Sequence, residues 1–316
     1  YWDRIIPGGK SEDIWTDVHS YDDLPKIKNP EIGWLQNAND PPWTSTIPMM
    51  LNPADFPGYM SPNLMHFRPQ RSAKMLMEDS LITFDELVNY KLSTRLEFAD
   101  RILDDLFEAI DIHGSEKAKS AKIILQNWER DADSDSKGML LFFTWANKFK
   151  ITDRSNFITD WDINDPINTP DGLSNPQKAV KLFEDAINEI QTKFGRLDIA
   201  WGDYYRINYN GIDLPANGID GRLGVYRVAW PGRSDDDNMY VGGGDSWVSV
   251  IEFGDKIKAK ALLSYGNSTE KDSPNNGDQL KLFSQKILRD VWFYENDINN
   301  NLVKVEYKSN NKFILK

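Results

Sequence analysis

Proline residues spaced every few positions through residues 1–70 most constrain how this chain can fold. Proline fixes its own φ angle, lacks a backbone N–H and keeps the preceding residue out of the helical region. The sequence therefore predicts a long irregular segment over residues 1–70. Irregular segments of this length are uncommon unless they are functional or disordered. Tryptophans such as Trp15, Trp34 and Trp43 argue against disorder.

From Arg71 the pattern changes, and hydrophobic residues recur at helical spacing as far as residue 195. A capping box, Thr83-Phe84-Asp85-Glu86, predicts the start of one long helix that runs towards Ile110. Three further helices are expected to begin near Ser115, at Gly138 and at Ser174-Asn175-Pro176. Residues 71–195 are therefore predicted to be mainly helical.

Residues 196–316 contain short runs with β-type composition, separated by turn residues. The strand candidates are 198–209, 223–230, 239–241, 247–253, 257–265 and 302–307, with one helix expected over 278–288. The run 246–253 alternates imperfectly and is expected to be buried on both faces. The chain is thus predicted to be α+β, a helical layer followed by a β-rich half.

Composition excludes several classes of function. The net charge is −12 and the sequence pI is near 4.8, which disfavours nucleic-acid binding because that usually needs a basic face. No apolar run approaches the ~20 residues of a membrane span, so no membrane crossing is predicted. The chain has no cysteine, which removes thiol catalysis and disulfides. The three histidines share no metal-binding spacing.

The segment 33–43 holds two amides two residues apart, Asn37 and Asn39, followed by Asp40-Pro41-Pro42. In an extended chain these amides point to the same face, and the prolines then force a turn that Asp40 is expected to fix. One interpretation is a polar turn in which the amides satisfy the local backbone. The other is an amide donor aimed at developing negative charge, as in an oxyanion hole. The spacing alone leaves both open.

Two other motifs have some features of ligand-binding loops. Residues 160–165 resemble a calcium loop, but Asp165 stands where the loop needs glycine, and Pro166 follows. Gly242-Gly243-Gly244 lacks the lysine and spacing of a phosphate-binding loop, so a strand in which backbones approach closely is favoured. No cofactor is predicted.

The segment 33–43, of the form aromatic-x-Gln-Asn-x-Asn-Asp, resembles the β-chain signature of the penicillin acylase family, which includes the acyl-homoserine lactone acylases. Five further segments resemble that family in the same order. They are the Arg71 region 69–75, the run 127–138, Trp201-Gly202-Asp203, the run 241–247 and the closing stretch 272–283. Each motif is weak alone, but their order along the chain is specific.

The resemblance implies an αββα N-terminal-nucleophile hydrolase fold and a catalytic role for several residues. It identifies Asn39 as the oxyanion-hole donor, Asn37 as a residue that holds the Asn39 loop, and Arg71 as an orienting arginine. It also implies a periplasmic or exported parent, and leaves open a structural calcium in the intact fold. The family's nucleophile is a serine at the N-terminus of the β-chain, whose own α-amino group is the base.

This chain begins with Tyr1, only 38 positions before Asn39, and no serine stands at its terminus. We therefore expect the C-terminal part of a β-chain, inactive alone, whose partners are an α-chain, the N-terminal part of the β-chain and a small acyl-amide substrate. Ser174 is disfavoured as nucleophile because it follows Asn39 and starts a helix. The alternatives are a carbohydrate-binding or glycoside-hydrolysing protein, suggested by 11 tryptophans and many acids, and a non-catalytic acylase-like scaffold.

Overall fold

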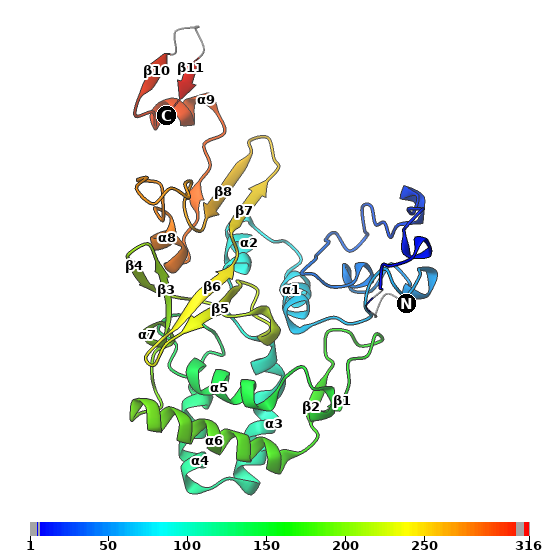
Figure 1. The fold of residues 1–316 in the computed structure, drawn as a ribbon, viewed down its shortest axis with the longest axis vertical. Helices are drawn as coiled ribbons and strands as arrows, with labels where there is room; N and C mark the ends of the chain where they lie inside the picture. The colour runs from blue at the N-terminus through cyan, green and yellow to red at the C-terminus, as the bar shows by residue number, and fades with distance from the viewer. Residues whose placement is uncertain (1–4, 6, 308–312, 316) are drawn as a thin grey trace.

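A computed structural model describes residues 5, 7–307 and 313–315 of the chain. Figure 1 shows the helices α3 to α6 gathered at one end, a β-sheet above them, and a small C-terminal hairpin at the opposite end. The N-terminal segment lies to one side, next to α1 (Phe67–Met77). Helices and strands thus occupy separate regions, which confirms the α+β class.

In the described residues before α1, the helical elements are single 3-10 turns, as the prolines there require. These turns are η1 (Ser11–Asp13), η2 (Tyr21–Asp23), η3 (Pro42–Thr44) and η4 (Pro53–Asp55). Proline occupies the first position of η3 and of η4, where no backbone N–H is needed. Trp43 is 2% exposed and packs against Phe56, so the segment has a small core of its own.

The helical layer consists of α2 (Phe84–Lys91), α3 (Glu97–His113), α4 (Glu116–Gln126), α5 (Met139–Phe149) and α6 (Pro176–Phe194). The expected caps are present. Thr83 and Glu86 form the capping box, Ser115 accepts from Ala118 N, and Asn175 accepts from Lys178 N. Gly195 ends α6 in the left-handed conformation. At the centre, Phe98 stacks on Trp145 and contacts Phe142 and Phe149.

The prediction of one long helix from Thr83 to Ile110 is wrong, because residues 92–96 separate α2 from α3. The break pairs with a distant segment: Leu96 N donates to Arg130 O, and Ala132 N donates to Thr94 O. Thr94 Oγ1 also donates to Asp133 Oδ1. These long-range bonds outweigh the helical spacing of the hydrophobic residues, which continues across the break.

The β-rich half forms two sheets. The first has the order β4-β3-β6-β5, from β3 (Tyr205–Tyr209), β4 (Ile212–Pro215), β5 (Ala229–Ser234) and β6 (Met239–Gly244). The second has the order β7-β8-β9, from β7 (Trp247–Glu252), β8 (Lys258–Leu263) and β9 (Arg289–Asp290). Two small hairpins pair β1 (Phe157–Thr159) with β2 (Asp171–Leu173) and β10 (Val305–Tyr307) with β11 (Phe313–Leu315).

Short helical elements replace several predicted strand segments. The start of the 198–209 run is α7 (Trp201–Tyr204), and the 223–230 run begins in η6 (Gly221–Leu223) and is not a strand until Ala229. The expected helix 278–288 shortens to α8 (Leu280–Ser284). The remaining short elements are η5 (Arg154–Asn156) and α9 (Glu295–Asn300).

Arg227 and Gly224 explain why residues 223–228 are not a strand. Arg227 is 1% exposed, and its guanidinium donates to the carbonyls of Asn217 and Phe283 and stacks on the Phe283 ring. Burial lowers the pKa of Arg227 to about 10. Gly224 has φ +89° and lies so close to Glu97 that a Cβ would be 2.5 Å from the Glu97 Cβ. Tertiary contacts therefore override the β-type composition.

Strand β7 is buried on one face only, which corrects the expectation of two buried faces. Val248 and Val250 are buried, whereas Trp247 and Ile251 are exposed. The glycine-rich run does behave as a close approach of backbones: a Cβ on Gly242 would lie 2.6 Å from Gly232 Cα in the paired strand. Neither residue could carry a side chain without a shift of the strands.

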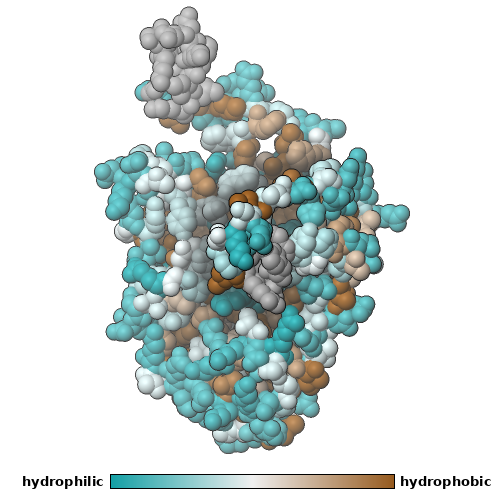
Figure 2. Space-filling view, turned by 45° about the vertical axis from the view of Figure 1, so that its right-hand side comes forward, coloured by the Kyte–Doolittle hydropathy of each residue, from teal (hydrophilic) through white to brown (hydrophobic). Residues whose placement is uncertain are grey.

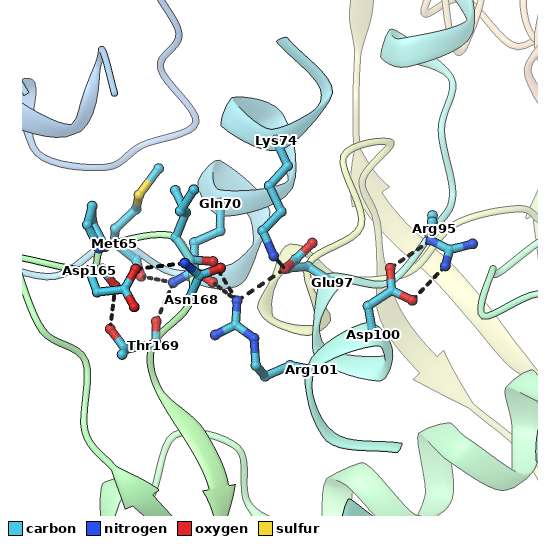
Figure 3. Close-up of polar contacts among 12 residues, drawn as sticks. Met65, Gln70, Lys74, Arg95, Glu97, Asp100, Arg101, Asp165, Asn168 and Thr169 are labelled. Carbon is cyan, nitrogen blue, oxygen red and sulfur yellow. Dashed lines mark hydrogen bonds and ion pairs between the residues drawn. The ribbon is translucent and has the colours of Figure 1, made fainter. Parts of the chain in front are cut away.

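A buried carboxylate, Glu97, links α1 and α3 (Figure 3). Glu97 is 1% exposed, and its Oε1 contacts Lys74 Nζ at 2.5 Å and Arg101 Nη2 at 3.2 Å. Arg101 also donates to the carbonyls of Ile167 and Pro170. Gln70, on α1, donates to Thr169 O at 2.7 Å. The network therefore holds α1, α3 and the 160–170 loop in one arrangement.

The surface in Figure 2 is mainly hydrophilic over its lower, helical part, and hydrophobic residues gather towards the upper part. Exposed hydrophobic residues of the second sheet and the segment after it include Phe253, Trp292 and Phe293. Among the described residues, no helix combines the length and the hydrophobicity needed to span a bilayer.

We predict that Glu97→Ala lowers the free energy of unfolding by about 3–5 kcal/mol, because Lys74 and the buried Arg101 lose their charge partner. Urea denaturation measures the change. Glu189→Ala, which removes an exposed partner of Lys148, is the matched control and should cost under about 1 kcal/mol. Equal losses in the two variants would contradict the role given to the network.

Candidate active site around Asn39

The loop that carries Asn39 is built around the carboxylate of Asp40. Asp40 is 8% exposed and accepts hydrogen bonds from Ala38 N at 2.7 Å, Gln36 Nε2 at 2.7 Å and Thr44 Oγ1 at 2.5 Å. Gln36 Nε2 also donates to Thr44 O. Asp40 therefore fixes the turn, as expected from its place before two prolines, and its oxygens are occupied by these donors.

Asn37 stabilises the same turn through its side-chain amide. Its Oδ1 accepts from Asn39 N at 3.1 Å, and its Nδ2 donates to Asp40 O at 3.3 Å. The carbonyl oxygen and the NH2 group of the Asn37 amide thus both bind the loop backbone. These contacts are those of a residue that holds Asn39 in place.

Asn39 is held in an unusual backbone conformation, with φ +64° in the left-handed region. Asparagine tolerates this region better than most residues, but it remains uncommon outside glycine. The side chain is exposed, and Asn39 Oδ1 accepts a 2.6 Å hydrogen bond from Arg68 Nη2. The structure records no hydrogen bond from Asn39 Nδ2 to any described residue. The carbonyl end of the amide is therefore fixed, and its N–H end is available to a ligand.

Arg68 extends from the first turn of α1 to Asn39, and Gly221 of η6 packs against the Arg68 side chain. A Cβ on Gly221 would lie 2.7 Å from both Cδ and Nε of Arg68, so the arginine packs directly against this glycine. A residue of η6, in the β-rich half of the chain, thus positions a residue of α1. Sequence reasoning did not single out Arg68, because nothing local distinguishes it from the other arginines.

Arg71 also lies on α1, near the middle of the helix. Its Nε is buried without a hydrogen-bond partner among the described residues, and the contact with Asn39 comes from Arg68 instead. The orienting role expected for Arg71 stays a prediction, since no contact in the described residues supports it.

A cavity of about 760 Å³ opens beside Asn39. One part of the lining is the start of α1 and the residues before it, with Leu64, His66 and Arg68. A second part comes from η6 and the residues after it, with Val228 and Trp230. The third part comes from residues 151–170 and includes Phe157 and Trp161. The lining is mostly apolar, with a few polar groups near Asn39, as in small-molecule sites.

The cavity also contains charged groups. Arg154 contacts Asp160 at 3.4 Å, and Arg222 contacts Asp220. Desolvation and the nearby guanidinium groups of Arg154 and Arg68 lower the pKa of His66 below 6.5. His66 is therefore uncharged at neutral pH.

The described cavity lining contains a hydrogen-bond donor, Asn39, but few side chains that could act as a nucleophile. Its one hydroxyl among the described residues belongs to Thr152. Ser174 is elsewhere, next to the cap of α6, and its Oγ donates to Ser155 O at 2.6 Å. The arrangement can therefore stabilise a developing negative charge, and a nucleophile would have to enter it.

In the acidic loop 160–165, carboxylate oxygens of Asp162 and Asp165 accept hydrogen bonds from nearby asparagines. Asp162 Oδ1 accepts from Asn164 N and Nδ2, and Asp165 Oδ1 accepts from Asn168 Nδ2. Across the described ranges, no group of three or more histidine, aspartate or glutamate side chains is placed to hold a metal ion.

Four of the ten tryptophans that the structure describes are core residues. Trp43, Trp145 and Trp201 are at most 2% exposed, and Trp128 is 7% exposed. Trp15, Trp230, Trp247 and Trp292 are exposed, and among the described tryptophans only Trp161 and Trp230 line the cavity. The described part of the chain therefore places two tryptophans at the candidate site, fewer than a row of rings along a sugar-binding cleft would need.

Comparison with known proteins places the chain in a family. The family model for penicillin amidase matches residues 2–300. Acyl-homoserine lactone acylase PvdQ of Pseudomonas syringae pv. syringae is 24% identical, covering 93% of this chain and 40% of that protein. The PvdQ of Pseudomonas fluorescens is 25% identical with the same coverage. This chain therefore spans about 40% of the length of these relatives.

A thermostable penicillin G acylase from Alcaligenes faecalis is similar in structure, with a TM-score of 0.54 and 15% identity over 92% of this chain and 59% of that chain. At this identity the likeness concerns the fold alone, which mixes helices and sheets in both proteins. The chain belongs to the penicillin amidase family, whose characterised relatives here are acylases.

We predict that stability declines as the pH falls through about 6.5, in part because of His66. The folded-state pKa of His66 lies below its unfolded value, so the unfolded chain binds the proton first. His66→Gln should make the free energy of unfolding less dependent on pH between 7 and 5, as measured by urea denaturation. The control is His113→Gln, on α3. An unchanged pH dependence in His66→Gln would show that His66 does not contribute.

Proposed function

We propose that this chain is the C-terminal portion of the β-chain of an acylase that hydrolyses linear amides, such as an N-acyl-homoserine lactone or a penicillin-type side-chain amide. One observation carries the proposal. Asn39 stands at the mouth of an apolar cavity with its Oδ1 held by Arg68. Family membership and the printed activities of the relatives support it.

The chemistry follows from the orientation of the amide. When a nucleophile attacks the substrate carbonyl, negative charge develops on the carbonyl oxygen, and Asn39 Nδ2–H donates to it. Arg68 holds the other end of the amide and polarises it, which strengthens the N–H as a donor. The strained backbone of Asn39 and the brace from Asn37 keep the donor aimed before the charge appears.

In this proposal the nucleophile is a serine at the N-terminus of the β-chain, outside the 316 residues, with its own α-amino group as base. The partners are that N-terminal part of the β-chain and an α-chain, and the intact protein is periplasmic or exported and activated by processing. The gene sequence upstream of Tyr1 tests this directly: a Gly-Ser-Asn well before Tyr1 supports it. An upstream sequence without such a serine favours a non-catalytic scaffold.

We predict that the 316-residue chain alone does not hydrolyse a chromogenic acyl amide, because an oxyanion donor without its nucleophile cannot form an acyl-enzyme. Release of the chromophore is followed over hours at micromolar protein. Steady hydrolysis that Asn39→Ala abolishes would show that the nucleophile lies within this chain.

In the product of the complete gene, Asn39→Ala is expected to lower kcat by roughly 100- to 1000-fold with little change in stability, because one oxyanion donor is lost. Chromogenic assays and thermal melting measure the two effects. An unchanged kcat would overturn the role of Asn39.

Gly221→Ala in the same protein should lower kcat by roughly 10- to 100-fold, because the new methyl group displaces Arg68 and with it the Asn39 amide. Gly58→Ala is the matched control, since a Cβ there meets nothing within 4 Å. Activity equal to that of the control would show that Arg68 does not orient Asn39.

A further inference from the structure

The Gln36 side chain, in the loop that carries Asn39, has a buried oxygen without a hydrogen-bond partner. Gln36 is 6% exposed, and its Nε2 donates to Asp40 Oδ2 at 2.7 Å and to Thr44 O at 2.8 Å. Both partners are acceptors, so the amide nitrogen must face them and Oε1 must face away. Oε1 is buried and accepts no hydrogen bond from any described residue. An unpaired buried acceptor is costly, which indicates that a donor from elsewhere completes it.

Gln36 lines a cavity of about 290 Å³ that is distinct from the cavity beside Asn39. Residues 35–37 of the loop and residues 249–251 of β7 both contribute to its lining, and α1 and α2 supply most of the rest. Helix α2 lies next to β7 (Figure 1). The two cavities share no lining residue, since the loop contributes residues 35–37 to one and residues 38 and 39 to the other. The loop that carries Asn39 therefore borders both cavities.

Strand β7 presents an open edge to this second cavity, since it is the outer strand in the order β7-β8-β9. Ser264 N donates to Ser246 O, and backbone hydrogen bonds alternate along an antiparallel pair, so every second residue of β7 pairs with β8. The N–H and C=O groups of Trp247, Ser249 and Ile251 therefore point away from β8, and no described segment on that side hydrogen-bonds to them. Such an edge is a template for a further strand.

An extended strand suits this gap better than a compact ligand or a second copy of the chain. A row of backbone donors and acceptors pairs with main chain. A second copy would bring another net charge of −12 to the interface, and residues 35–37, which line the same cavity as the edge, would obstruct it. The proposed N-terminal part of the β-chain can supply the strand. This chain spans 40% of the PvdQ relatives, so most of their length lies outside the matched stretch.

We propose that Gln36 is a positioning residue that couples the docking of such a strand to the turn that carries Asn39. A strand from the N-terminal part of the β-chain pairs with the open edge of β7, and one N–H group of that incoming segment donates to Gln36 Oε1. This inference rests on the proposed function, which supplies the segment and gives Asn39 its role.

The coupling follows from the two ends of one planar amide. When Oε1 accepts a hydrogen bond, the amide is polarised and Nε2 donates more strongly to Asp40 and Thr44. Asp40 in turn accepts from the backbone N–H of Ala38, which precedes Asn39. The turn that carries Asn39 is therefore most rigid in the assembled protein, where Gln36 has all its partners.

Amide hydrogen exchange tests the docking, by comparing the 316-residue chain with the product of the complete gene. We expect the amides of Trp247, Ser249 and Ile251 to exchange at least ~100-fold more slowly in the complete product. The amides of Val248 and Val250, which already face β8, are the internal control and should slow far less. Equal exchange of the three edge amides in both proteins overturns the docking. Slowing that appears in the 316-residue chain as its concentration rises also overturns it, because a second copy then occupies the edge.

Gln36→Lys in the complete product tests the coupling, because lysine keeps donors for Asp40 and Thr44 but has no acceptor. We expect kcat to fall roughly 10-fold and the exchange of the edge amides to rise, whereas the same substitution leaves the melting temperature of the 316-residue chain unchanged. Gln126→Lys, at an exposed position that ends α4, is the matched control and should change none of these.

Two results would overturn the role of Gln36: edge exchange that Gln36→Lys does not alter, or a lower melting temperature of the 316-residue chain, which would show a purely local function in the turn. Failure of the proposed function is distinguishable from both. It would appear as the absence of an upstream nucleophilic serine, with the edge amides of β7 still protected in the complete product.

Discussion

The arrangement of the cavity depends on one buried carboxylate. Glu97 is almost fully enclosed, joins Lys74 of α1 to Arg101 of α3, and lies against the backbone at Gly224, just after η6. A buried charge of this kind is tolerated only with its partners in place, so it specifies how these elements meet. Since α1 carries Arg68 and η6 carries Gly221, the same contact sets the distance between two walls of the cavity.

Two charged residues next to Asn39, Asp40 and Arg68, are used in different ways. The carboxylate of Asp40 accepts hydrogen bonds from donors of its own loop and holds the turn. Arg68 donates one hydrogen bond to a neutral amide, so its positive charge remains in the cavity. The net charge of the chain is negative, whereas the cavity lining has more arginines than aspartates.

Several elements were predictable because their signals are local. The capping box at Thr83, the cap at Asn175 and the close approach at the triple glycine all depend on neighbouring residues, and the structure contains each of them. The break in the helix at residues 92–96 and the non-strand at 223–228 were not predictable. Each is stabilised by hydrogen bonds to segments more than 30 positions away, which no local pattern records.

The sequence by itself determined the family, the irregular proline-rich start and the Asn37–Asp40 turn, because proline geometry and amide spacing act within a few residues. Only the tertiary structure decided which arginine holds Asn39. Arg68 and Arg71 are three positions apart on one helix, and from sequence they are equivalent. The close contact with Gly221 and the hydrogen bond to Asn39 distinguish Arg68, and both come from segments that the fold, not the chain order, brings together.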